Sequence, residues 1–182
     1  MKKNQILKLV YAAVCLALAM VLPFLTGQIP QIGDALCPMH IAIFICGFVC
    51  GGPYGMLVGF VAPLLRFALF GMPAIFPTGI GMAFELASYG LISGVLYRRL
   101  PKKIPYIYVS LISAMIGGRI VWGIVRFIIM GLQGTTFPMS AFIAGAVTNA
   151  IPGIVLHILF IPVVVIALRK AHIIEDEKGR VA

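Results

Sequence analysis

PMHIAIFICGFVCGGPYGMLVGFVAPLLRFALFGMP, residues 38–73, decides the fold of this chain. The segment consists of two apolar runs, and Arg66 is the only Asp, Glu, Lys or Arg within it. A helix that crosses the ~30 Å hydrocarbon core of a bilayer needs about 20 apolar residues. Glycine and proline at 51–53 separate the two runs, so we expect one helix over 38–51 and another over 54–70. The segment therefore predicts two membrane helices joined by a tight turn, of which the first is short for a span.

The rest of the chain continues this pattern. Of its 182 residues, 62% are apolar and 10% are charged, whereas soluble domains carry about 25% charged residues. This composition excludes a water-soluble globular domain, a disordered chain and a coiled coil. We expect an all-α integral membrane protein with a single membrane domain over 1–182, in which Pro152 and Pro162 kink the last helix. The six expected transmembrane helices cover residues 6–26, 38–51, 54–70, 78–97, 105–131 and 139–168.

Basic residues are concentrated in alternate loops. The net charge is +9, and all of the 14 Lys and Arg residues except Arg66, Arg119 and Arg126 precede the first apolar run, occupy 98–103 or lie in the tail 169–182. Cytoplasmic loops are the ones that carry excess Lys and Arg. We therefore expect both termini, the 98–103 loop and the polar tail to be cytoplasmic. The loops expected outside contain no Lys or Arg and cover 28–37, 71–77 and 132–138.

A few polar side chains lie inside the apolar runs, where burial in lipid costs several kcal/mol unless they are paired or face a cavity. With a rise of 1.5 Å per residue, most of them fall in the outer half of the membrane. Arg66, Arg119 and Arg126 outnumber Glu85, the one carboxylate in these runs. Glu85 pairing with Arg119 would be structural, and at least one guanidinium group would then remain for an anionic ligand, since its fork matches a carboxylate. The alternative for Arg66 and Arg126 is that they extend to the outer interface.

The candidate binding residues follow from this distribution. Arg66 and Arg126 are expected to bind an anionic group, and His40, Glu85 and Asn149 to bind hydroxyl or amide groups. His40 as a hydrogen-bonding group at a helix start and Asn149 as an interhelical hydrogen bonder remain alternatives. The full set of candidate substrate-binding residues is Arg66, Arg126, His40, Glu85, Asn149, Trp122, Met39, Phe67, Met72 and Phe84.

Motifs for catalysis and metal binding are absent from the sequence. It contains no GxxxxGK[ST] loop for ATP, no HExxH and no GxSxG. The four cysteines form no CxxC pair, and the three histidines are scattered, so no metal site is predicted. The sequence therefore indicates neither an enzyme nor a cofactor bound by this chain.

The chain resembles the substrate-binding membrane subunits (S components) of energy-coupling factor (ECF) transporters, the bacterial vitamin importers. The resemblance rests on the small-residue step Ala13 and Ala17, on residues 38–73, on GMAFELASYGLISGVLYRRLP (81–101) and on NAIPGIV (149–155). It implies a six-helix bundle in the bacterial plasma membrane that binds its ligand near the outer face, under a lid formed by the first external loop. Ala13 and Ala17 would dock on a transmembrane coupling subunit, and two cytoplasmic ATPase subunits would bind the ATP.

The PMH…PLLR…GMP pattern is most similar to the pantothenate-type group, and the excess of arginine independently favours a carboxylate such as pantothenate. Within the same class, a cobalamin precursor or a pyridoxine-like compound is the alternative substrate. From another class, the alternatives are a small membrane channel or a membrane enzyme.

Overall fold

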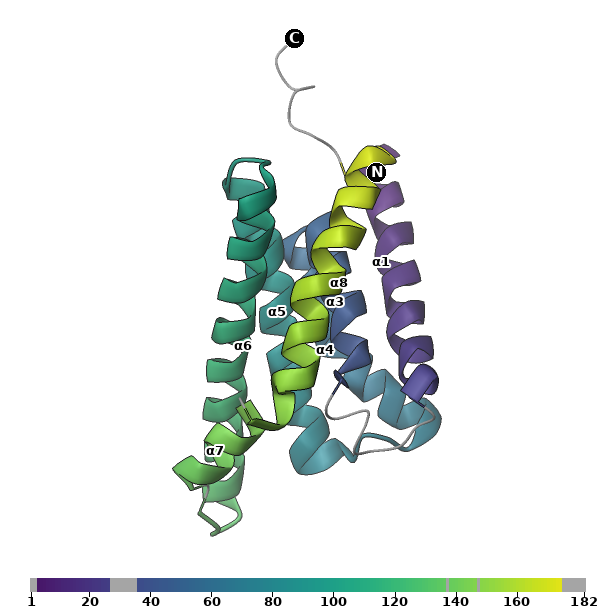
Figure 1. Ribbon diagram of the computed structural model, residues 1–182. Coiled ribbons are helices and arrows are strands. Elements are labelled where there is room, and N and C mark those ends of the chain that lie inside the picture. The colour runs from purple at the N-terminus through teal and green to yellow at the C-terminus, as the bar shows by residue number, and fades with distance from the viewer. Residues whose placement is uncertain (1–2, 27–35, 137, 147, 175–182) are drawn as a thin grey trace.

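The computed structural model describes residues 3–26, 36–136, 138–146 and 148–174, and all of the regular secondary structure in these ranges is helical (Figure 1). Within them, five stretches are long and apolar enough to cross a membrane. The remaining expected span, over 38–51, corresponds to α3 (Pro38–Cys50). This helix has only 13 residues and is therefore ~20 Å long. The five stretches cover Gln5–Leu25, Gly52–Phe70, Ile75–Arg99, Ile104–Leu132 and Ile151–Lys170.

The helices run alternately up and down the bundle (Figure 1). α1 continues into a short turn, η1 (Leu22–Thr26), and α5 is preceded by another, η2 (Ile75–Gly79). The remaining helices are α1 (Lys3–Val21), α4 (Gly52–Phe70), α5 (Ile80–Arg99), α6 (Ile104–Leu132), α7 (Met139–Ala146) and α8 (Ile151–Lys170).

The prediction of one continuous helix over 139–168 is wrong. The structure divides it into α7 and α8, with the short segment η3 (Thr148–Ala150) before α8. Pro152 lies in the first turn of α8, a position that proline favours because its missing N–H has no helical partner there. Pro152 therefore begins a helix instead of kinking one, whereas Pro162 does lie inside α8.

The short helix α3 lies at the centre of the bundle. It packs against α1, α4, α5 and α8, and Ile43, Phe44 and Cys46 are fully buried. A helix that is apolar on all sides is buried on all sides, which explains why the segment opening on PMHIAIF occupies the core. Residues on α3 consequently face every neighbouring helix.

Glycines bring α3, α4 and α5 unusually close together. A Cβ added at Gly90 would lie 2.8 Å from Cα of Gly55, and one added at Gly55 would lie 2.9 Å from Cα of Gly47. Small residues allow membrane helices to approach until their backbones touch. These contacts fix the position of α5 against the two helices that precede it.

One end of the bundle carries the basic residues of the helix ends and of the 98–103 loop, and we call it the basic end. α1 begins there and α8 ends there, beside the connection from α5 to α6 (Figure 1). The Arg98 guanidinium donates a hydrogen bond to the carbonyl of Cys50, and the Lys102 ammonium donates to the carbonyl of Tyr97. Cationic side chains thereby bind carbonyl groups at the C-terminal ends of both α3 and α5. The cytoplasmic location of this end stays a prediction.

We expect Gly90→Ala to destabilise the bundle, because the added methyl group would collide with the backbone of Gly55 and overpacking costs about 1–3 kcal/mol. Gly131→Ala is the matched control: among the described residues, no atom outside its own helix lies within 4 Å of a Cβ added there. Reversible unfolding in mixed detergent micelles, followed by circular dichroism, measures both variants. Equal loss of stability in the two would contradict the close packing of α4 on α5.

Candidate functional site

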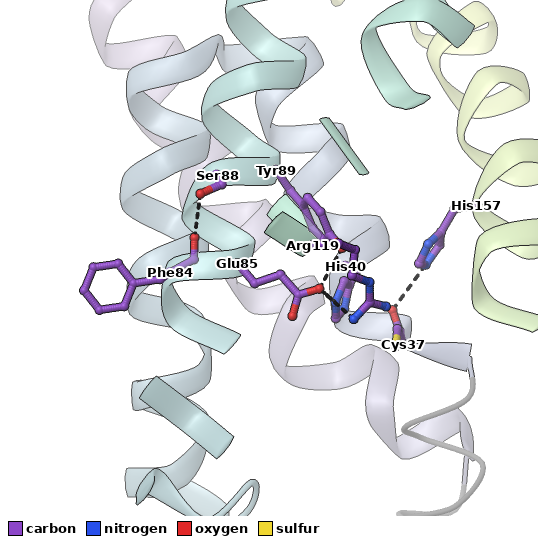
Figure 2. Close-up of polar contacts among 8 residues, drawn as sticks. All are labelled: Cys37, His40, Phe84, Glu85, Ser88, Tyr89, Arg119 and His157. Atoms are coloured by element: carbon purple, nitrogen blue, oxygen red, sulfur yellow. Dashed lines mark hydrogen bonds and ion pairs between the residues drawn. The ribbon is translucent and has the colours of Figure 1, made fainter. Parts of the chain in front are cut away.

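Five polar side chains from four helices meet in the interior, and we call them the central polar cluster (Figure 2). Their exposed fractions are 2% for Glu85, 3% for His40 and 3% for His157, and Tyr89 is equally buried. Arg119 is the most accessible member, at 18% of its side chain. Since burying such groups in a membrane protein is costly, their convergence marks the strongest candidate for a functional site among the described residues.

The Glu85 carboxylate is the centre of the cluster. Its Oε1 atom accepts a hydrogen bond from the Tyr89 hydroxyl at 2.7 Å and pairs with Nη1 of Arg119 at 2.9 Å. Nε2 of His40 lies 3.8 Å from the same oxygen, beyond hydrogen-bonding distance. The expected pairing of Glu85 with Arg119 is confirmed, and it neutralises both charges. In the described part of the chain, all of these groups lie on Oε1, and Oε2 is turned away from them (Figure 2).

Two histidines face each other beside this carboxylate. The His40 and His157 rings stack with centroids 5.8 Å apart and planes at 17°. Nε2 of His157 lies 3.3 Å from the carbonyl oxygen of Cys37, and because a carbonyl only accepts, Nε2 is the donor. Neither ring nitrogen of His40 has a hydrogen-bond partner among the described residues. A buried imidazole without a hydrogen-bond partner is costly, so His40 indicates a group that the described residues do not supply.

Local sequence explains why these groups meet. Glu85 and Tyr89 are four residues apart, so they lie on the same face of α5. Gly118 precedes Arg119 on α6, and a Cβ at Gly118 would overlap the Tyr89 ring. The glycine thus lets α6 approach until the Arg119 guanidinium reaches Glu85.

A second group of side chains extends the site along α6, away from the basic end. Arg119, Trp122 and Arg126 are three and four residues apart in succession, which places them on one helix face. The Arg126 guanidinium lies 5.8 Å from the centre of the Trp122 ring, and that ring stacks at 6.1 Å on Phe142 of α7. A Cβ added at Gly81 of α5 would lie 3.3 Å from Cδ of Arg126. The Arg126 side chain therefore packs against α5 at Gly81, one helical turn before Glu85.

Arg66 lies elsewhere. It is 5% exposed, and its Nη1 donates a hydrogen bond of 2.8 Å to the carbonyl of Met20. Its guanidinium also lies 5.4 Å from the ring of Phe24 and 5.2 Å from the ring of Phe70. The structure thus places Arg66 between α4 and the end of α1, and its expected role in anion binding stays a prediction.

The other candidates are dispersed. Phe84 points away from Glu85 (Figure 2) and packs edge-on against Phe60. Met39 is buried in the core, Phe67 is half-buried and Met72 is exposed. The side chain of Asn149 and residues 27–35 of the first external loop lie outside the described part of the structure.

Comparison with known protein families decides the class of protein. A family model of the ECF transporter substrate-specific component matches residues 7–164. The chain belongs to this family. Searches of the curated proteins and of the solved structures gave no match. The chain is therefore a substrate-binding subunit of a transporter, a class that consists of membrane proteins and not of enzymes.

Sequence reasoning missed Tyr89 and His157 as members of the site in this S component. The four-residue spacing between Glu85 and Tyr89 was a usable signal, because it predicts a shared helix face and a hydrogen bond. No local signal identifies His157, which reaches the cluster only through the packing of α8 on α3. Within the described ranges, no three His, Cys, Asp or Glu residues are grouped so that they could hold a metal ion.

We expect Arg119→Leu to destabilise this S component by about 3–5 kcal/mol, since it leaves Glu85 buried without its counter-ion. The double variant Glu85→Leu/Arg119→Leu should recover most of that loss because both charges are gone. Tyr89→Phe removes one donor to the ionised carboxylate but leaves the ion pair intact, and it should cost about 1.5–3 kcal/mol. Unfolding in mixed micelles gives the coupling free energy of the pair, and purely additive effects of the two leucines would show that the ion pair contributes nothing.

Proposed function

We propose that this S component binds a small carboxylate-bearing vitamin or cofactor precursor for an ATP-driven bacterial importer, with pantothenate as the first candidate. The observation that carries the proposal is the convergence of the central polar cluster with Arg126. Four helices contribute to it, and it lies away from the basic end. It includes the buried His40 imidazole, whose nitrogens have no hydrogen-bond partner among the described residues. A pocket that satisfies polar groups of its ligand rejects analogues that lack them.

Charge favours an anionic ligand. Glu85 and Arg119 neutralise each other, and Arg126 is the next arginine on the same face of α6. A guanidinium group binds a carboxylate through two parallel hydrogen bonds. Arg66 is the second candidate for this role, although its contact with the Met20 carbonyl favours a structural one.

The positive-inside rule supports an orientation in which the basic end faces the cytoplasm and the ligand enters from outside. We further propose a transmembrane coupling subunit and two cytoplasmic ATPase subunits as partners in the plasma membrane. Ala13 and Ala17 are exposed on α1, whereas Ala12 and Ala19 are buried within the chain. The exposed pair offers the flat surface on which another helix packs closely.

A second candidate ligand is supported by the aromatic pair Trp122 and Phe142, whose rings lie nearly parallel at 27°. Planar ring compounds pack favourably on such surfaces. A cobalamin precursor of the benzimidazole type or a pyridoxine-like compound would use this feature.

The ligand can be identified directly. Mass spectrometry of the detergent-purified protein should detect a co-purified small carboxylate, and titration of the ligand-free protein with a vitamin panel should change the fluorescence of Trp122, the only tryptophan in the chain. Trp122→Phe is the control for signals that arise from the added compound. A panel in which no compound binds would contradict the proposed function.

Transport tests the partner surface. We expect Ala13→Leu/Ala17→Leu to lower ATP-dependent uptake about tenfold or more, because overpacking a helix interface costs about 1–3 kcal/mol and 1.4 kcal/mol is a factor of ten. Ligand binding by the isolated subunit should be unchanged. Ala167→Leu, at an exposed alanine of α8, is the matched control. Undiminished uptake in the double variant would contradict docking through α1, and uptake without any ATPase would favour a channel.

A further inference from the structure

Arg66 is a buried cation whose charge no described residue neutralises. It is 5% exposed, and the ion pairs among the described residues all involve Glu85 of the central polar cluster. Of the Arg66 guanidinium nitrogens, only Nη1 has a hydrogen-bond partner in the described chain, the carbonyl of Met20 at 2.8 Å. A guanidinium group carries five N–H donors, and a buried charge without a counter-ion is costly. Within the described ranges, Arg66 therefore lacks an anion.

Aromatic rings hold this guanidinium near one end of the bundle. It lies 5.4 Å from the centre of the Phe24 ring on η1 and 5.2 Å from that of the Phe70 ring on α4, and the two rings meet edge-to-face at 5.1 Å. Phe70 ends α4 and is four residues after Arg66, so the cation lies only ~6 Å before that helix end. Because α4 begins just after Cys50 at the basic end, Arg66 lies near the opposite end of the bundle (Figure 1).

The side chains around Arg66 are apolar and exposed. Leu25 is 79% exposed and Leu69 is 59% exposed, and the rings of Phe24 and Phe70 are also exposed. Nε and Nη2 of Arg66 have no hydrogen-bond partner among the described residues, yet neither is among the nitrogen atoms that are shut off from the surface. Exposed apolar patches of this kind mark surfaces that contact a membrane. An anion held by Arg66 would therefore be surrounded by apolar surface.

These features fit an amphiphile better than a polar solute. A pocket for a small polar solute offers several polar groups that fix its orientation, whereas the described contacts of Arg66 are one carbonyl and two aromatic rings. A phospholipid joins acyl chains to a phosphate, which a guanidinium group binds through two parallel hydrogen bonds. Its headgroup region also borders the hydrocarbon core, at the level of a helix end. An anionic headgroup neutralises Arg66, whereas a zwitterionic headgroup brings a second cation.

We infer that Arg66 binds the phosphate of an anionic phospholipid, in the leaflet at the end of the bundle opposite the basic end. The phosphate lies at Nε and Nη2, and the acyl chains cover Leu25 and Leu69. Because Nη1 binds the carbonyl of Met20 in the last turn of α1, the lipid sits where α1 is joined to α4. No described contact of Arg66 involves the central polar cluster, so this inference goes beyond the proposed function and does not depend on it.

Photo-crosslinking tests the lipid and its site together. The full chain is placed in phosphatidylcholine nanodiscs that contain a small fraction of either photoactivatable phosphatidylglycerol or matched photoactivatable phosphatidylcholine, with the reactive group next to the phosphate. In the wild-type protein, phosphatidylglycerol should label residues 22–26 and 67–70 about fivefold more than phosphatidylcholine does. Arg66→Gln should reduce the phosphatidylglycerol labelling there to the phosphatidylcholine level. Arg99→Gln, at an exposed arginine of the basic end, is the matched control and should leave that labelling unchanged.

Competition separates a lipid from a free anion and needs no variant, in case Arg66→Gln does not fold. Neither inorganic phosphate nor pantothenate, added to the wild-type nanodiscs at constant ionic strength, should lower the labelling of 67–70. The inference is overturned if the two lipids label this segment equally, if Arg66→Gln keeps the preference for phosphatidylglycerol, or if Arg99→Gln removes it. Displacement by inorganic phosphate would show an adventitious anion site only and overturns the lipid. Displacement by pantothenate also overturns the lipid, but it would support the proposed function with Arg66 as its anion-binding residue.

Discussion

The ion pair between Glu85 and Arg119 is the interaction on which the rest of the site depends. Lipid provides no solvent for either charge, so each group must find its counter-ion inside the bundle. The pair joins α5 to α6 at 2.9 Å, and Tyr89 adds a donor to the same oxygen. Because Oε1 of Glu85 accepts both of these contacts, the orientation of the whole carboxylate group is fixed. The ion pair therefore joins two helices and fixes the orientation of the Glu85 carboxylate.

The glycine contacts among α3, α4 and α5 make this arrangement reproducible. Backbones that touch at Gly47, Gly55 and Gly90 leave no space for a helix to slide or rotate. Glu85 lies just over one turn before Gly90 on α5. The contacts at Gly90 therefore also fix the position of the helix backbone that carries the Glu85 carboxylate. By contrast, Trp122 and Arg126 contact α7 and the start of α5 through aromatic and aliphatic surfaces, which constrain orientation less than touching backbones do.

The sequence was sufficient for the membrane class, because 62% apolar residues and long apolar runs leave few alternatives. It was also sufficient for the pairing of Glu85 with Arg119, since a lone buried carboxylate must find a cation. It was not sufficient for α7 and α8, because Pro152 is compatible with either a kink or a helix start and only packing decides. Nor does hydropathy distinguish Arg66, bonded to a carbonyl of α1, from Arg126 beside Trp122. That distinction depends on which helices are neighbours, and this information is absent from local pattern.

The short length of α3 affects how deeply in the membrane a solute would be bound. Its last carbonyl, that of Cys50, is bonded by Arg98 at the basic end, and its 13 residues cover about two-thirds of a ~30 Å hydrocarbon layer. His40 lies ~15 Å along the helix from Cys50. With the basic end facing the cytoplasm, as proposed, a solute held at His40 would already have traversed roughly half of the permeability barrier. Binding energy alone would drive that part of the journey, and the proposed nucleotide hydrolysis would have to supply the free energy of release as well as the remaining movement.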